Sequence, residues 1–258
     1  MAAPLMVGIA PILGGYLQHF FGWRSVFVFL CVYGAILWFV VVCLFQETKA
    51  SISSKKISLV SILDNFMLLL RSKTFVGYTL CAVCAYGGFM AFYTLGPFLL
   101  AHAGIGPIGI GWLVALLDVG IIVGSIINII FVQKVGINKM MFVGTFLMLI
   151  AGLSMLTADL LHFVNTAEIM IPAFTFALGA ILLMCNAFSG AMTPFPEASG
   201  AAGGLLGGFQ MLGGAVASSV VALFTTFDRE ILLSSIYIVL GLISILALKF
   251  LATKVGKE

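Results

Sequence analysis

The chain has 258 residues, of which 62% are hydrophobic and 8% are charged, and its formal net charge is +3. A typical soluble domain has about 25% charged residues, and a soluble fold of this size could not bury so much apolar surface. The composition therefore excludes a soluble enzyme, a nucleic-acid-binding protein and a disordered chain. It predicts an all-α polytopic membrane protein, because alternation of polar and apolar residues is too rare for a β-barrel.

Apolar runs near the length that crosses a bilayer, about 20 residues, follow one another along the chain. The first run has no basic segment before it, so it does not resemble a secretory signal peptide. It resembles a membrane span whose beginning is missing. The eight predicted spans cover residues 1–18, 25–46, 74–100, 108–132, 139–158, 167–190, 200–226 and 231–252.

The distribution of Lys and Arg predicts the orientation, because cytoplasmic loops are enriched in both residues. Eight crossings place both termini on one side of the membrane. The other side carries only Arg24 and Arg229, two of the twelve basic residues. Both termini are therefore predicted to be cytoplasmic, in the plasma (inner) membrane, with His19, His102 and His162 outside.

The longest loop, residues 47–73, divides the chain into a part with two spans, 1–46, and a part with six, 74–258. Within this loop, apolar residues between 59 and 70 recur at i, i+3 and i+4, while Ser61 and Asp64 lie on the other face. This pattern predicts a short amphipathic helix at the cytoplasmic interface. A helix that links two bundles is favoured over a regulatory site.

Polar side chains within spans are costly in lipid and usually face protein or a watery cavity. The spans at 139–158 and 231–252 have no internal acid or amide, so both are predicted to face lipid, as are Tyr237 and Trp38. The other four spans of the six-span bundle are predicted to line a cavity. Asn186 and Gln210 are predicted to face the bundle interior. Aromatic residues could bind a substrate through their rings, and amides could bind it through hydrogen bonds. The candidate substrate-binding residues are Tyr86, Phe89, Phe92, Asn128, Asn186 and Gln210.

Asp118 is the only acid within a predicted span, and no intramembrane Lys or Arg can pair with it. An Asp at the centre of a membrane helix costs about 2.5–3.5 kcal/mol. Such a residue is either protonated or exposed to water in a cavity, and both states suit proton coupling or cation binding. The alternative is a polar residue that is tolerated because it hydrogen-bonds to a neighbouring helix.

Small residues predict sites of close helix packing. Gly200, Gly204 and Gly208 lie four residues apart on one helix face, a spacing that lets two backbones approach each other. A second small-residue segment contains a proline, which bends a membrane helix. This second segment includes Ala10, Pro11, Gly14 and Gly15.

Cys81 and Cys84 form a C-x-x-C spacing, but no second pair or histidine lies near them. They are predicted to be small buried hydrophobic residues rather than a metal or redox site. The chain has no P-loop and no sequence motif of a catalytic or metal site. Neither an enzymatic activity nor a cofactor or metal is therefore expected.

Several segments occur in an order that is known from one family. They are Ala10-Pro11-Ile12-Leu13-Gly14-Gly15, Phe21-Gly22-Trp23-Arg24, Tyr86-Gly87-Gly88-Phe89, Gly124-Ser125 with Asn128, and Pro194-Phe195-Pro196 with Gly208-Phe209-Gln210. Together they resemble the Bcr/CflA-type drug-resistance transporters of the major facilitator superfamily. The first segment is similar to the antiporter motif of the fifth helix, and the last to the tenth-to-eleventh helix signature.

This resemblance implies a fold of twelve helices in two halves of six, of which the chain would contain half of the fifth helix and all of helices six to twelve. The loop at 47–73 would then be the central loop between the halves. Ala10 stands where the antiporter motif prefers Gly. Leu117 stands where relatives tend to carry Asn, so no family role passes to the neighbouring Asp118.

Two functions remain open at this point. The first is a secondary transporter that exports drugs or metabolites in exchange for protons by alternating access, with the lipid bilayer, a small-molecule substrate and protons as partners. The second is a non-transporting fragment, or one half of a split transporter that acts as a membrane interaction protein with a separate N-terminal half. In the second case the chain alone would insert into the membrane but would not confer drug efflux.

Overall fold

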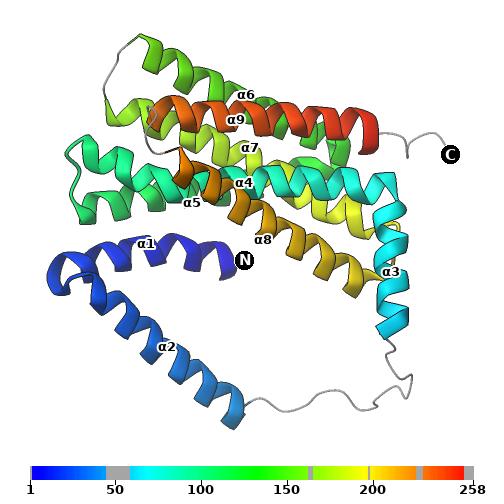
Figure 1. The fold of residues 1–258 in the computed structure, drawn as a ribbon, viewed down its shortest axis with the longest axis horizontal. Coiled ribbons are helices and arrows are strands. Elements are labelled where there is room, and N and C mark those ends of the chain that lie inside the picture. The colour runs from blue at the N-terminus through cyan, green and yellow to red at the C-terminus, as the bar shows by residue number, and fades with distance from the viewer. Residues whose placement is uncertain (1, 45–58, 162–164, 197, 225–228, 253–258) are drawn as a thin grey trace.

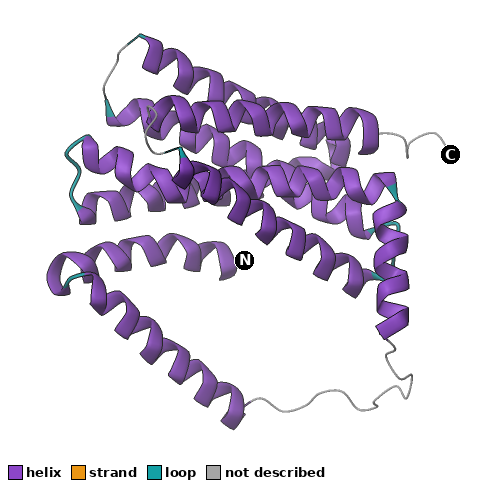
Figure 2. Cartoon of the chain, viewed as in Figure 1, coloured by secondary structure: helices purple, strands orange, loops and turns teal. Residues whose placement is uncertain are grey.

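The computed structural model describes residues 2–44, 59–161, 165–196, 198–224 and 229–252, and all regular structure in these ranges is helical (Figures 1 and 2). The all-α fold class is therefore confirmed. Residues 47–58 of the predicted linker, His162 and the lysines after residue 252 lie outside the described residues. The described helices are α1 (Ala2–Phe21), α2 (Trp23–Leu44), α3 (Leu59–Arg71), α4 (Lys73–His102), α5 (Pro107–Val135), α6 (Ile137–Leu160), α7 (Thr166–Met192), α8 (Ser199–Leu223), α9 (Arg229–Ala247) and a short π-helical segment, η1 (Leu248–Ala252).

Glycine, proline and a capping side chain define several helix ends. Gly22, between α1 and α2, and Gly136, between α5 and α6, have φ angles of 78° and 87°, which glycine adopts without steric cost. The Ser72 hydroxyl accepts a hydrogen bond from the backbone N–H of Phe75 at the start of α4. Pro107 begins α5, where its missing N–H donor is not needed. These residues place the connections within a few positions of those that the hydropathy pattern predicts.

Seven of the described helices, α2 and α4 to α9, are long and apolar enough to cross a membrane. The helix α1 is continuous over 20 residues, and its crossing remains a prediction. The helix α3 has 13 residues and is the amphipathic helix predicted within the loop. Its Leu69 is fully buried, whereas Asp64 is exposed.

The helices α4 and α7 occupy the centre of the bundle. The helix α4 packs on α7, α8 and α9, and α7 also packs on α5 and α6. In Figure 1, α8 crosses this group obliquely and α3 stands across one end of it. The helix α1 runs along α5, and α2 packs chiefly on α1 and extends away from the bundle.

Two glycines bring the backbones of α6 and α7 into contact. A Cβ atom on Gly144 would lie 2.5 Å from the carbonyl oxygen of Gly179 and 3.0 Å from the backbone nitrogen of Leu183. A Cβ atom on Gly179 would in turn meet the Gly144 carbonyl oxygen and lie 3.0 Å from the backbone nitrogen of Met148. Small residues permit such close approach between membrane helices, and no larger residue fits at either position.

The prediction that α6 and α9 face only lipid is wrong. Each helix buries one side in the bundle, and α6 also contacts α9 closely, since a Cβ atom on Gly152 would lie 2.9 Å from the backbone nitrogen of Ile238. A count of acids and amides does not detect this burial, because it is achieved with small, apolar and hydroxyl side chains. The fully buried residues include Met141, Thr145 and Met148 of α6 and Leu233, Ser234 and Ser244 of α9.

Tyr237 of α9 corrects a second prediction. It is 1% exposed rather than facing lipid. The Tyr237 ring stacks on the Phe176 ring with 3.8 Å between centroids. The Phe89 ring contacts the same Phe176 ring edge-to-face, with 6.1 Å between centroids. This aromatic group joins α9, α7 and α4 in the core. Trp38 of α2 is 69% exposed, and its contact with lipid remains a prediction.

Candidate functional site

A hydrogen bond joins the middle of α4 to the middle of α5. The Tyr93 hydroxyl donates to Oδ1 of Asp118 at 2.9 Å. Asp118 is 1% exposed, and no described group hydrogen-bonds to its Oδ2. The alternative function-free explanation for Asp118 requires a hydrogen bond to a neighbouring helix, and Tyr93 provides one. This bond satisfies only one of the two carboxyl oxygens. Buried polar atoms normally have partners, so Oδ2 is an exception among the described residues.

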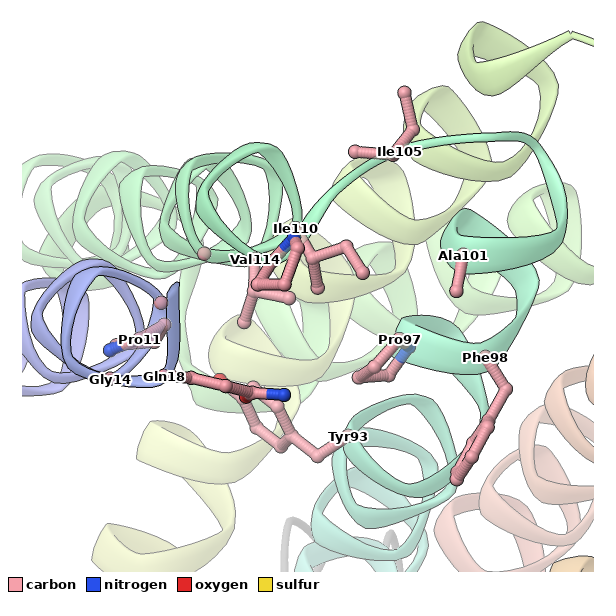
Figure 3. A pocket seen from close by; sticks show the side chains of 13 residues that line it. Pro11, Gly14, Gln18, Tyr93, Pro97, Phe98, Ala101, Ile105, Ile110 and Val114 are labelled. Atoms are coloured by element: carbon pink, nitrogen blue, oxygen red, sulfur yellow. The ribbon is translucent and has the colours of Figure 1, made fainter. Parts of the chain in front are cut away.

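A cavity of about 580 Å³ lies beside this pair, between α1, α4 and α5 (Figure 3). Its volume falls in the range of small-molecule sites, about 300–1,000 Å³. Gln18 and Tyr93 are the two lining residues whose side chains carry a hydrogen-bonding group, and Figure 3 shows these side chains extending toward the same space from α1 and α4. Val114, one turn before Asp118 on α5, is buried at the inner end, whereas Gln18 and Ala101 are exposed. Tyr93 therefore stands between the cavity and the carboxyl group of Asp118.

The helices α1 and α5 cross in backbone contact at the edge of this cavity. A Cβ atom on Gly15 would lie 2.8 Å from the Pro107 carbonyl oxygen, and one on Gly111 would lie 2.6 Å from the Pro11 carbonyl oxygen. Each helix thus offers a glycine four residues after a proline, and each glycine meets the other helix's proline. Two members of the predicted small-residue segment, Pro11 and Gly15, take part in this crossing.

The remaining predicted packing residues do not contact another helix in the described part of the chain. Nothing lies within 4 Å of a Cβ position on Gly14, Gly200, Gly204 or Gly208, and Ala10 is exposed. The helix α8 instead meets α4 further along, at Gly213 and Gly214. Cβ atoms there would contact three α4 side chains, Val83, Tyr86 and Met90.

The amide candidates lie on α5, α7 and α8 and make two separate sets of contacts. The Asn186 side chain donates hydrogen bonds to Oδ1 of Asn128 at 2.6 Å and to the Leu182 carbonyl oxygen at 2.7 Å. The Gln210 side chain donates to the Met184 sulfur at 3.0 Å. Asn186 and Gln210 are both buried, which confirms that they face the bundle interior.

The predicted aromatic candidates lie in different surroundings. Tyr86 is half-buried, and its hydroxyl donates to the Met211 sulfur at 3.6 Å. Phe89 belongs to the aromatic core, and Phe92 is buried against Gly96. Neither phenylalanine lines the cavity beside Asp118.

The cavity residues with polar side-chain groups, Tyr93 and Gln18, are absent from the predicted set of site residues. A signal for Tyr93 is present in the sequence. It lies nine residues before the end of α4 at His102, and Asp118 lies eleven residues after the start of α5 at Pro107. In an antiparallel pair with a short loop, residues equally far from the loop share the same depth in the bundle.

The predicted burial of the C-x-x-C pair is confirmed. Cys81 and Cys84 are buried on α4, and the Cys81 thiol contacts the Ser244 carbonyl oxygen of α9 at 3.8 Å. Among the described residues, no group of three or more His, Cys, Asp or Glu could hold a metal ion. The two thiols therefore pack one helix against another.

Comparison with known proteins identifies the family. A family model described as Major Facilitator Superfamily matches residues 1–218. The chain belongs to the major facilitator superfamily. The match includes all of α1 to α7 and most of α8, and therefore every residue of the candidate site. Superfamily membership, together with the relatives below, makes the chain a transporter-family protein and not an enzyme.

Two of three similar proteins have names that refer to drug resistance, in agreement with the resemblance to drug-resistance transporters. A protein named bicyclomycin resistance protein homolog, from Haemophilus influenzae, is 29% identical over 86% of this chain and 55% of its own length. Multidrug resistance protein D of Escherichia coli is 27% identical over the whole chain and 63% of its own length. An uncharacterized MFS-type transporter of Bacillus subtilis is 25% identical over 84% of the chain. The chain thus spans between about half and two thirds of the length of these relatives.

Proposed function

We propose that this chain acts in the proton-coupled export of drugs or small metabolites across the inner membrane, by alternating access. The observation that carries the proposal is the buried carboxyl group of Asp118, with one oxygen bonded to Tyr93 and the other without a partner. Intramembrane acids are the usual elements of proton relays in transporters. Asp118 would bind a proton from one side of the membrane and release it to the other.

The substrate would be an apolar or cationic small molecule. The cavity beside Asp118 is lined mainly by apolar residues, and it includes the aromatic rings of Tyr93 and Phe98. Aromatic rings attract cations as well as apolar groups. The names of two relatives refer to drug resistance, which supports this substrate class.

The contact between α1 and α5 suits a movement of one helix against the other. Gly15 and Gly111 present no side chains that would interlock across it. A smooth backbone surface lets two helices rock without repacking side chains, as alternating access requires. This contact would change the access to the cavity that lies beside it.

The proposed orientation has both termini and the α5–α6 connection in the cytoplasm, and the α4–α5 connection outside. Two single substitutions, Ala103→Cys and Lys139→Cys, place a cysteine at each of these connections. Neither substitution replaces a nearby glycine, Gly104 or Gly136, whose positive φ angles disfavour other residues. After Cys31 and Cys43, both exposed, are replaced with serine, an impermeant maleimide should label the first cysteine in intact cells. The second should react only after permeabilisation, and the reverse pattern would overturn this orientation.

The transport proposal is tested by expressing the chain in a host that lacks its major drug pumps. We expect the chain to lower the accumulation of a lipophilic cationic dye, and a protonophore to restore accumulation, because export would depend on the proton gradient. The control is the same host with an empty vector, and membrane insertion is checked by immunoblotting. An inserted chain that leaves dye accumulation at the control level would contradict the proposal.

A further inference from the structure

Tyr93 both lines the cavity and forms a hydrogen bond with the side chain of Asp118. Its hydroxyl lies 2.9 Å from Asp118 Oδ1, while its side chain forms part of the cavity wall. Asp118 itself does not line the cavity and is almost fully buried. We infer that the Tyr93 hydroxyl relays protons between the cavity and Asp118, an inference that rests on the proposed coupling role of Asp118.

The geometry suits a two-sided proton transfer. A tyrosine hydroxyl has one proton to donate and lone pairs that accept a hydrogen bond. In this structure the donor side is directed at Asp118, so an acceptor side remains available to water. The exposed amide of Gln18, at the rim of the cavity, gives entering water a polar partner.

The transfer is balanced without any net change in Tyr93. A hydronium ion in the cavity gives a proton to the Tyr93 oxygen as the hydroxyl proton of Tyr93 passes to Oδ1 of Asp118. The hydronium ion becomes water, the carboxylate becomes a carboxylic acid, and Tyr93 is neutral before and after. Once Asp118 has released this proton, rotation of the new hydroxyl proton of Tyr93 toward Oδ1 restores the starting arrangement.

The other titratable groups near this pair do not offer a second route. Tyr86 of α4 and Tyr237 of α9 lie within electrostatic reach of Tyr93. The hydroxyl of Tyr86 is bonded to the Met211 sulfur. Tyr237 is buried with its ring stacked on Phe176. Among the described residues, Tyr93 is the side chain that hydrogen-bonds to Asp118.

Infrared spectroscopy of the full chain in lipid nanodiscs tests the relay without relying on transport. The carboxylic C=O band of protonated Asp118 is assigned as the band that Asp118→Asn removes, and its exchange is followed after transfer to D2O. In Tyr93→Phe we expect the band to shift, because its hydrogen bond is lost. We also expect exchange to slow by about a hundredfold, the lower end of what a positioned proton-transfer group supplies. The hydroxyl of Tyr78, on the same helix, donates a hydrogen bond to Oδ1 of Asn138 at 2.9 Å, away from Asp118. Tyr78→Phe is therefore the matched control and should exchange like the original chain.

A second pair of variants tests the cavity while leaving Tyr93 intact. Gln18→Trp should fill the rim of the cavity and slow the exchange of the Asp118 band, whereas Tyr16→Trp, at an exposed position of α1 outside the cavity, should not. Unchanged exchange in both Tyr93→Phe and Gln18→Trp would overturn the relay but leave the coupling role of Asp118 standing. The absence of any band that Asp118→Asn removes, at acidic as well as neutral pH, would instead overturn the coupling role itself.

Discussion

Replacing Gly179 with valine is expected to force α6 away from α7 and to lower the free energy of unfolding by about 3 kcal/mol, the upper end of the usual cost of overpacking. The groups that a Cβ atom would meet include the Gly144 carbonyl oxygen and the backbone nitrogen of Met148. Backbone atoms within a helix cannot move aside as a flexible side chain can. The added side chain must therefore be accommodated by separating the two helices.

The matched control is Gly204→Val on α8, which makes the same chemical change within a helix. Nothing lies within 4 Å of its Cβ position, so the unfolding free energy should change by no more than about 0.5 kcal/mol. Both variants can be compared by unfolding the chain with denaturant in mixed micelles and following the helical circular dichroism. Equal destabilisation at both glycines would show that the α6–α7 contact is not the cause.

This pair of glycines also shows what the sequence does not reveal about packing. The regular spacing of Gly200, Gly204 and Gly208 predicts a packing face, whereas Gly144 and Gly179 are isolated in the sequence and attract no attention. In the structure the isolated glycines form the backbone contact, and the spaced ones do not meet another helix among the described residues. Close approach requires a small residue on the partner at the same depth, and local spacing carries no information about the partner.

The helices themselves can be predicted well, because apolar length and helix-ending residues are local properties. Burial cannot be predicted in this way, as Tyr237 shows: its predicted span, residues 231–252, has no acid or amide, yet its ring lies in the aromatic core on Phe176. Within the site, Asp118 can be predicted because an acid inside an apolar span is conspicuous. Its partner Tyr93 is one of several aromatic residues on α4, and only the pairing of α4 with α5 distinguishes it.

Asp118→Asn is expected to reduce gradient-driven dye efflux to the level of the empty-vector host while the folded protein is retained. Asparagine has nearly the same shape, and its side-chain oxygen can still accept the hydrogen bond from Tyr93 that Asp118 Oδ1 accepts now. It cannot bind or release a proton, so it imitates the protonated acid permanently. Helix content and detergent stability should therefore match those of the original chain.

A carboxyl group outside the site provides the control. Asp64 is exposed on the amphipathic helix α3. Asp64→Asn makes the same chemical change at this position, and we expect efflux to stay at the level of the original chain. If Asp118→Asn pumps as well as the original chain, Asp118 is a tolerated polar residue held by Tyr93 and not the coupling group.

Substrate counterflow in proteoliposomes separates coupling from binding. Exchange of labelled for unlabelled dye across the membrane needs the substrate site and the access change, but it needs no net proton movement. Asp118→Asn should therefore retain counterflow while it loses gradient-driven efflux. Loss of both activities in a correctly folded variant would instead assign Asp118 to substrate binding or to the access change, because a residue that only carries the proton is dispensable when no proton has to move.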